Sequence, residues 1–539
     1  MDVKKKKSLF LLLTAVIAML HVALVVGYGM QKEGFHEDEY YTYWSGTNET
    51  PTISQNYVWY RGHDLMSKFF VGEGQGFSFA KVVQNQAWDV HPPLYYVSLH
   101  IFMSLFPGRF YKWFGILLNL LYSLITYGGI VLFCYRMDHS DNRYMLSLLS
   151  GLSYVVAPSS VSNCMLARMY TMSGMWTVIY ANIFLLLLQN YQSGWRKFLK
   201  IVAAGAITCY LSFLTHYFTL LVPFALTVFY CGYVLYKRKG IVKMAVYGCC
   251  MLAAIAMAVL TFPASYGHIF RGYRGTGAMN SFKSGGILGM MTYFLPILNR
   301  YVFAGWMWGI MILTGICLVV GMILLIGRCR KRQNPATKFY PLAASVCSCI
   351  FGIWFLCRTA LALGSDSARY FYPVIAFLLP LIVYSIGKTA CCLPLLKRNG
   401  SYRCGLAVVL AILVILPSFA GYAQGNVLFL YADEKEKISF SREYREYPAV
   451  VIYNGEAPYR EWYAADQLWV FENIFYADYE HMLEDFEEER LFTAEKTVVF
   501  LDSHYTSADV LNVLLENNSG LNKYTLVRQD QFFNVYLLE

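Results

Sequence analysis

Three consecutive acidic residues follow the first apolar segment and form the first group that could do chemistry. They are Glu37, Asp38 and Glu39, inside the run F-H-E-D-E-Y-Y. A carboxylate there can act as a general base and accept the proton of an incoming hydroxyl group, provided that it faces a cleft. Neighbouring carboxylates repel one another, which tends to raise the pKa of one of them. The alternative interpretation of the same run is a solvated acidic loop.

Four arginines are candidate ligands for an anion, and three of them are followed within two residues by a tyrosine. An arginine near a membrane surface can hold a phosphate through two parallel hydrogen bonds. The alternative is that each side chain only reaches toward lipid head groups. The candidate binding residues of this group are Arg168 and Tyr170 in A-R-M-Y, Arg271 and Arg274 in R-G-Y-R-G, and Arg369 and Tyr370 in A-R-Y.

Two histidines complete the candidate site. His91 opens the motif H-P-P-L-Y-Y, and His216 lies in L-T-H-Y-F. Either could orient a substrate, bind a divalent metal together with Glu37 or Glu39, or only pair with the backbone. No spacing resembles a zinc motif such as H-E-x-x-H, so no cofactor is required, although a divalent metal stays open. A glycine-rich phosphate loop is absent as well, so a soluble nucleotide-sugar donor has no visible binding site.

The composition predicts which kind of protein must position these residues. Of the 539 residues, 57% are hydrophobic and 14% are charged, whereas a soluble protein carries roughly a quarter charged residues. Apolar runs of about 20 residues recur, and this is the length that a helix needs to cross the hydrocarbon core. The 14 cysteines lie almost entirely in or beside these runs, so no disulfide framework is predicted. We therefore expect a mainly α, multi-pass membrane protein without nucleic-acid partners.

About eleven membrane spans are predicted. Lys4 to Lys7 precede the first apolar run, Leu9 to about Gly29, which is too long for a cleaved signal peptide. The other predicted spans are Trp113–Tyr135, Tyr144–Val161, Met172–Leu188, Phe198–Thr215, Phe218–Tyr236, Ile241–Phe262, Phe303–Ile326, Tyr340–Leu363, Tyr370–Ile386 and Cys404–Tyr422.

Charge predicts the orientation of these spans. With a cytoplasmic N-terminus, the positive charges fall in the inner loops, as the positive-inside rule expects. Those loops contain Arg136, Arg143, Arg196, Lys197, Lys200, Lys237, Arg238, Lys239, Arg328, Arg330, Lys331, Arg332, Lys397 and Arg398. The acidic run, Arg168, His216, the loop 263–286 and Arg369 then lie on the outer side, and an odd number of spans places the C-terminal segment there too. Arginine on the outer face runs against this bias, which favours a function for it.

The domain organisation follows from a change in composition near Ala423. Residues 1–422 form the membrane domain, with a first outer loop at 30–112 that carries the acidic run and an apolar helix after Pro93 that is too short to span. Only 12 of the 34 acidic residues precede Ala423. Residues 423–539 predict a small, acidic α/β domain. Its predicted strands are 449–453, 496–502, 524–528 and 533–538, and its predicted helix is 507–517, with Thr506 or Ser507 as cap and 517–520 as stop.

These motifs resemble one family when they are taken together and in order. Asp38-Glu39 after the first span, His91-Pro92-Pro93-Leu94-Tyr95-Tyr96 late in the first outer loop, A-R-M-Y at Arg168, T-H-Y at His216 and A-R-Y at Arg369 resemble bacterial glycosyltransferases of family 39. These are GT-C fold relatives of protein O-mannosyltransferases and of the aminoarabinose transferase that modifies lipid A. The resemblance covers residues 1–422, and the C-terminal domain matches only in its placement.

The resemblance implies a donor, a side of the membrane and a mechanism. The donor would be a sugar on a polyprenyl phosphate, and the sugar would pass to a cell-surface acceptor (protein, lipid or polymer) on the extracytoplasmic side. Asp38 would stand at the acceptor hydroxyl with Glu39 in support, and Arg168 or another outer arginine would hold the departing phosphate. Transfer would invert the anomeric centre in a single displacement. Glu37 adds an acid before the usual pair, so the base is not assigned among these neighbours.

Two other functions remain open on the sequence. A polytopic lipid or sugar transporter or flippase would usually place ionisable groups near the middle of the bilayer, whereas charge here gathers at the predicted span edges. A surface receptor or assembly scaffold would act through the acidic C-terminal domain. The glycosyltransferase interpretation requires Asp38 and Arg168 to line one shared cavity.

Overall fold

The computed structural model describes residues 3–49, 54–284, 286, 288–329, 336–361, 364–392, 400–480, 482, 494–518 and 520–539. The chain divides into two compact units. Unit 1 comprises Met1–Gly29, Gln86–Ser98 and Trp113–Leu428, and unit 2 comprises Met30–Asn85, Leu99–Lys112 and Phe429–Glu539. Most of the outer loop 30–112 therefore groups with the C-terminal segment, whereas the sequence grouped it with the membrane domain.

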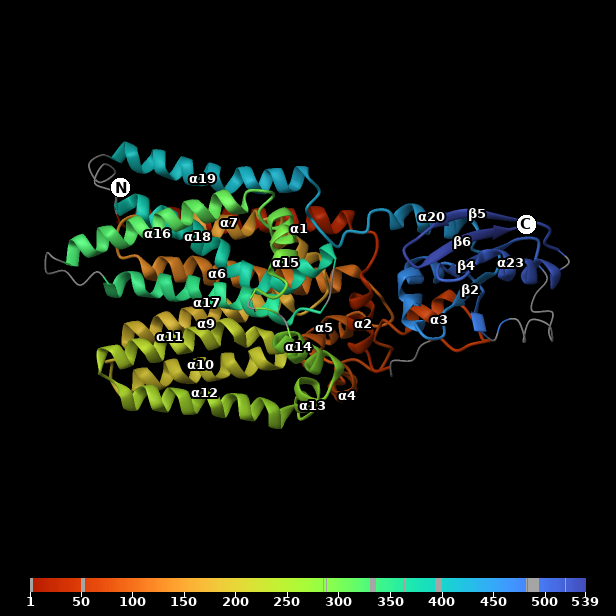
Figure 1. Cartoon of the computed structure of the whole chain (residues 1–539), viewed down its shortest axis with the longest axis horizontal. Helices are drawn as coiled ribbons and strands as arrows, with labels where there is room; N and C mark the ends of the chain where they lie inside the picture. Colours follow the sequence, from red (N-terminus) through yellow and green to blue (C-terminus); the bar gives the residue numbers. More distant parts are fainter. Residues whose placement is uncertain are drawn as a thin grey trace. The chain divides into compact units, whose positions relative to one another are not determined.

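Unit 1 is a bundle of long apolar helices that run alongside one another (Figure 1). Among the described residues, nine helices are long and apolar enough to cross a membrane, and a bent pair would make ten. With α16, helices lie at all eleven predicted positions, and the prediction of a mainly α, multi-pass membrane protein is confirmed. The bounds are α1 Val3–Gln31, α6 Lys112–Met137, α7 Arg143–Val155, α8 Pro158–Met165, α9 Tyr170–Asn190, α10 Trp195–Thr215, α11 Leu221–Lys237, α12 Ile241–Thr261, α16 Met307–Cys329, α17 Ala336–Thr359, α18 Tyr372–Cys392 and α19 Gly400–Ala423.

The third predicted span is broken rather than continuous. Helices α7 and α8 meet at an angle of 50°, and Pro158 begins α8, where its missing N–H group costs nothing. The carbonyl of Val155 at this break contacts Nδ1 of buried His21 at 3.1 Å, and Nε2 of the same ring contacts Ser123 Oγ at 2.6 Å. Backbone groups freed inside a membrane must find such partners. The proline and the histidine together explain the bend.

Shorter helices follow the ends of the long ones. The stretch expected as a loop at 263–286 instead contains two helices, α13 Ala264–Phe270 and α14 Tyr273–Ser284, followed by α15 Met291–Tyr301. Two 3₁₀ turns, η1 Tyr217–Leu220 and η2 Ser365–Phe371, precede α11 and α18. Some predictions fall outside the described residues. They concern the inner-loop charges Arg330, Lys331, Arg332, Lys397 and Arg398, the end of the predicted span Tyr340–Leu363 at 362–363, and Ser519 in the predicted helix stop.

Unit 2 contains a six-stranded mixed sheet in the order β1-β3-β2-β4-β6-β5. The neighbours β3, β2 and β4 are parallel, and the other pairings are antiparallel. The predicted small α/β fold and its four strands are confirmed. Two strands were not predicted: β3 is a short apolar run, and β1 is only two residues long. The bounds are β1 Trp59–Tyr60, β2 Ala449–Tyr453, β3 Ile474–Asp478, β4 Thr497–Asp502, β5 Tyr524–Gln529 and β6 Phe533–Leu538.

Helices cover both faces of this sheet, and each face has its own apolar core. On one face α23 Ser507–Glu516 packs Val510, Leu511 and Leu514 against the strands. On the other face Ala464 and Leu468 pack from η4 Pro458–Ala464 and α21 Ala465–Leu468. The predicted helix at 507–517 is confirmed. Other short helices in the described part of the chain are α2 Glu37–Ser45, α3 Gly62–Ser67, α4 Phe79–Trp88, α5 Leu94–Ser104 and α20 Glu434–Glu443.

Candidate functional site

The acidic run forms the first turn of α2 in unit 2. His36 is the N-cap, and its side chain accepts a hydrogen bond from the backbone N–H of Asp38 at 3.0 Å. Glu39 accepts from the backbone N–H of His36 at 2.9 Å and completes a capping box. Negative charge is favourable at a helix N-terminus because of the helix dipole. Part of the reason for three acids here is therefore structural.

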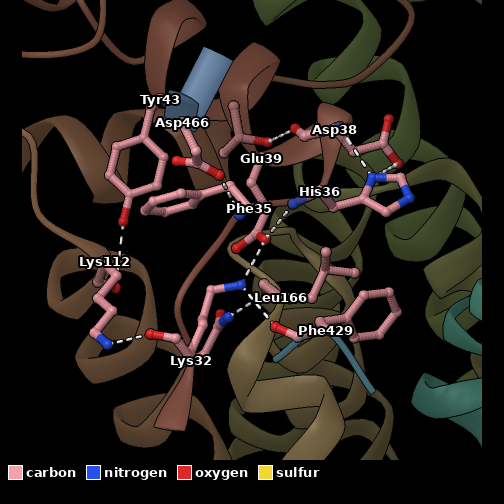
Figure 2. A network of polar contacts seen from close by, with 12 residues as sticks. Lys32, Phe35, His36, Asp38, Glu39, Tyr43, Lys112, Leu166, Phe429 and Asp466 are labelled. Carbon is pink, nitrogen blue, oxygen red and sulfur yellow. Dashed lines mark hydrogen bonds and ion pairs between the residues drawn. The ribbon is translucent and has the colours of Figure 1, made fainter. Parts of the chain in front are cut away.

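Glu39 is buried in unit 2 and forms an ion pair there. Its carboxylate forms an ion pair of 2.9 Å with Lys32, and both side chains are 1% exposed. Lys32 also donates to the carbonyl of Phe429 at 2.8 Å, while Lys112 donates to the carbonyl of Lys32 (Figure 2). These residues belong to the three separate chain segments of unit 2. The hydrogen bonds of Lys32 to Phe429 and Lys112 therefore join the three segments, and Glu39, which pairs with Lys32, has a structural role.

Breaking this ion pair is expected to destabilise unit 2 strongly. Removing one partner leaves a buried charge without compensation, which costs about 3–5 kcal/mol. Glu39→Gln and Lys32→Met should each lower the midpoint of thermal unfolding of the purified protein, and the double variant should lose less than the two losses added together. Fully additive losses would contradict a direct pairing.

Asp38 keeps partial solvent access in the same turn. Its side chain is 22% exposed, and Oδ2 lies 3.8 Å from Nδ1 of His36. Glu37 is also partly exposed. Figure 2 shows Asp38 and His36 lying together, with the backbone N–H of His36 also bonded to the carboxylate of Glu39 that binds Lys32. Of the three acids, Asp38 and Glu37 thus remain accessible to a substrate.

A buried acid from the C-terminal segment holds the start of the acidic run. The backbone N–H of Phe35 donates to Oδ2 of Asp466 at 3.0 Å, and Asp466 is 5% exposed. The pKa of this carboxyl group is raised from 3.8 to about 7. Burial is the largest cause and the negative charge of Glu434 adds to it, while the hydrogen bonds from Tyr40 and Phe35 and the charge of Lys32 lower the pKa.

This pKa predicts a pH-dependent stability. Because the folded state binds this proton more tightly than the unfolded state, the contribution of Asp466 is fully present below pH 4. It is lost as the pH rises through about 7. Asp466→Asn should therefore match the wild type in thermal stability near pH 4 and exceed it at pH 8. Equal stability of the two proteins at both pH values would contradict the raised pKa.

In unit 1, Arg168 occupies the turn between α8 and α9 and is held by the H-P-P-L-Y-Y motif. The guanidinium group is 4% exposed. Its Nη1 donates to the hydroxyl of Tyr96 at 3.1 Å, and its Nη2 lies 3.4 Å from Nε2 of His91. The turn itself is fixed by Asn119, which donates to the carbonyl of Leu166 at 2.6 Å. The sequence motif therefore positions a buried cation.

The other side of His91 faces a carboxylate. Nδ1 of His91 lies 3.0 Å from Oδ2 of Asp89. Burial alone would raise the pKa of Asp89, but the hydrogen bond with His91 and the positive charge of Arg168 outweigh it and lower the pKa. Asp89 is therefore ionised at neutral pH.

His216 and two tyrosines extend this cluster. The ring of His216 lies 5.7 Å from His91 and 6.1 Å from Tyr170, and Tyr170 packs edge-on against Tyr370 at 5.8 Å. Burial, and to a smaller extent the positive charge of Arg168, lower the pKa of His216 well below its usual range. Its Nδ1 accepts from the backbone N–H of Phe218 at 3.2 Å. A neutral His216 therefore carries its proton on Nε2, which can donate to a ligand.

The remaining predicted arginines differ from Arg168. Arg369 is buried, stacks on Tyr370 at 5.0 Å and forms an ion pair with Asp366 of the same 3₁₀ turn. Arg271 and Arg274 are exposed at α13 and α14, where they stack on Tyr266 and Tyr273 respectively.

Four residues of these clusters were missed from the sequence as site residues: Lys32, Asp89, Tyr96 and Asp466. Asp89 could have been found from its position two residues before His91, and Tyr96 from its place one helical turn after Pro93. Lys32 and Asp466 give no local signal, because their partners are brought to them by folding. No group of three metal-ligating side chains occurs within the residues that the structure describes. The shared cavity of Asp38 and Arg168 stays a prediction, since they belong to different units.

Comparison with known proteins gives distant similarities in structure. No protein-family model and no curated protein matches the sequence. The solved structure of ArnT from Cupriavidus metallidurans bound to undecaprenyl phosphate is 14% identical, with a TM-score of 0.49 over 99% of this chain and 98% of that chain. The oligosaccharyltransferase of Archaeoglobus fulgidus in complex with zinc and sulfate is 12% identical, with a TM-score of 0.45 over 93% of this chain and 69% of that chain.

Proposed function

We propose that this protein is a membrane glycosyltransferase of the GT-C type, which moves a sugar from a polyprenyl-phosphate donor to a cell-surface acceptor. The observation that carries the proposal is the buried Arg168, held by Tyr96 and His91 of one motif beside neutral His216. A lipid phosphate leaves the reaction as an anion, and positioned cations and N–H donors stabilise such a charge in the transition state. The family resemblance of the same motifs supports this donor class.

Arg168 is the proposed ligand of the departing phosphate. It contacts the hydroxyl group of Tyr96 and the imidazole of His91, and both contacts orient the guanidinium group. The Nε2–H group of His216 supplies a second donor, and Tyr170 and Tyr370 add aromatic surface. Arg369 is a weaker choice because Asp366 already forms an ion pair with it. Arg271 and Arg274 remain proposed substrate-binding residues, with contact to lipid head groups as the alternative for each.

Asp38 is the proposed general base. Glu39 is bound by Lys32, and this leaves Asp38 and Glu37 as the accessible acids of the run. In the proposed step the acceptor oxygen forms a bond to the anomeric carbon and its proton passes to Asp38. The bond from that carbon to the phosphate oxygen breaks at the same time, and polyprenyl phosphate leaves with the bonding electron pair. This single displacement inverts the anomeric centre.

The proposed orientation places the N-terminus in the cytoplasm, and both the acidic run and the C-terminal segment outside. Supply of donor and transfer of sugar would then occur on the extracytoplasmic side of a cell membrane. The acceptor carries a free hydroxyl group and is a protein, a lipid or a surface polymer.

A transfer assay in membranes tests this function. Membranes that contain the protein are given polyprenyl-phosphate sugars with radiolabelled hexoses or pentoses, and in parallel the matching nucleotide sugars. The proposal expects label to enter an acceptor from at least one lipid donor, with release of the polyprenyl phosphate. Transfer from the nucleotide sugar alone would overturn it, as would movement of the intact lipid donor between leaflets without transfer.

A further inference from the structure

Asp89 contacts the ring of His91 on the side opposite Arg168. Oδ2 of Asp89 lies 3.0 Å from Nδ1 of His91, and Nη2 of Arg168 lies 3.4 Å from Nε2. Both ring nitrogens therefore have a partner of fixed hydrogen-bonding character. An ionised carboxylate can only accept a hydrogen bond, and a guanidinium group can only donate one.

These two partners select one form of the imidazole. Asp89 requires a proton on Nδ1, and Arg168 requires a lone pair on Nε2. The opposite tautomer would place the N–H of His91 against the N–H of Arg168 and leave Asp89 facing a lone pair. The doubly protonated ring would also oppose Arg168. Only the neutral ring with its proton on Nδ1 satisfies both contacts.

We infer that Asp89 is a positioning residue that acts through His91 to orient Arg168 toward the phosphate of the donor. The role of Arg168 in this statement rests on the proposed function, whereas the state of His91 does not. Asp89 touches no substrate in this scheme. It fixes the tautomer of His91, which in turn accepts a hydrogen bond from the guanidinium group and so helps to hold it.

The backbone beside Asp89 is anchored by other residues. Nε2 of His268 contacts the carbonyl of Ala87 at 3.2 Å, and Nδ1 of the same ring contacts the hydroxyl of Tyr217 at 2.9 Å. Replacing the Asp89 carboxylate with an amide therefore leaves the local fold in place. An amide can donate as well as accept, so Asp89→Asn removes one of the two groups that select the tautomer of His91 and leaves only the longer contact of 3.4 Å with Arg168 to favour it.

Nitrogen NMR of the purified full chain with ¹⁵N-labelled histidine tests the first half of this inference without any substrate. The His91 signal is identified as the one lost in His91→Gln. We expect the wild type to show a protonated Nδ1 and an unprotonated Nε2, and Asp89→Asn to show a mixture of tautomers. A wild-type ring with its proton on Nε2, or one unchanged by Asp89→Asn, would overturn the inference whether or not the protein transfers sugar.

A double-mutant cycle tests the second half by measuring the transfer rate. A misplaced binding group can cost up to about 100-fold in rate, and we expect a loss of this order in Asp89→Asn. In a His91→Gln background the same change should have no further effect, because Asp89 acts only through His91. Equal losses in both backgrounds would contradict the inference even if the wild type transfers sugar normally.

A matched control is Asp64→Asn. Asp64 lies in the first turn of α3, is 63% exposed and has Oδ1 3.9 Å from Nδ1 of the exposed His63. This variant removes a carboxylate beside a histidine without touching Arg168. It should transfer sugar at the wild-type rate, and a loss as large as that in Asp89→Asn would show that the assay responds to charge alone.

Discussion

Asp38→Asn is expected to lower the rate of sugar transfer by about 10²- to 10⁴-fold, the usual contribution of a general base. The amide keeps the size of the side chain but cannot take the acceptor proton. The N-cap hydrogen bond to His36 comes from the backbone N–H of Asp38, which the substitution does not change. Helix α2 should therefore still form. The rate is measured in membranes under saturating donor, with the unfolding midpoint recorded for each variant.

Two further variants make this result specific. Asp64 also lies in the first turn of a helix, α3, and close to a histidine, but it is exposed; Asp64→Asn should leave the rate unchanged. Glu37→Gln should lower the rate less than Asp38→Asn does. If Asp38→Asn transfers sugar at the full rate while Glu37→Gln does not, the base is Glu37. If neither change matters, the acidic run has only a structural role.

Arg168→Gln is expected to lower the transfer rate by about 10²- to 10³-fold, as the loss of one charge-stabilising donor does in other enzymes. Its binding of undecaprenyl phosphate should weaken as well, because hydrogen bonds to a charged group contribute about 1.5–3 kcal/mol. Arg168→Lys should recover little, since an ammonium group cannot contact Tyr96, His91 and a phosphate with the geometry of a guanidinium.

The control for this result is Arg300→Gln. Arg300 is an exposed arginine in the last turn of α15, stacked on Tyr301 at 5.2 Å. The Arg300→Gln variant should bind undecaprenyl phosphate and transfer sugar as the wild type does. Wild-type binding in Arg168→Gln would move the phosphate site elsewhere and contradict the proposed function of this cluster.

Much of the fold could be predicted because its signals are local. A run of about 20 apolar residues predicts a span wherever it occurs, and helices lie at all eleven expected positions. The strands at 449–453 and 533–538 carry clear apolar patterns and were predicted within a residue. The bend before Pro158 was missed, because it needs both the proline and the distant His21 that contacts the freed carbonyl.

The candidate site was predictable in part, for the same physical reason. The motif around His91 and the turn at Arg168 are separate in sequence, and the structure brings them into contact. The role of Glu39 could not be foreseen, because Lys32 alone gives no hint that it will be buried beside Phe429, almost 400 positions later. Long-range pairing of this kind decides which acid of the run stays accessible.

The most direct test of the central claim counts both products of the proposed displacement. The purified protein is reconstituted in liposomes with a polyprenyl-phosphate sugar and an extract of cell-surface acceptors, and the products are measured by mass spectrometry. The account predicts one released polyprenyl phosphate for each glycosylated acceptor, with both products strongly reduced in Asp38→Asn and Arg168→Gln. Sugar transfer that continues unchanged in both variants, or a lipid donor that stays intact while the acceptor gains sugar, would contradict it.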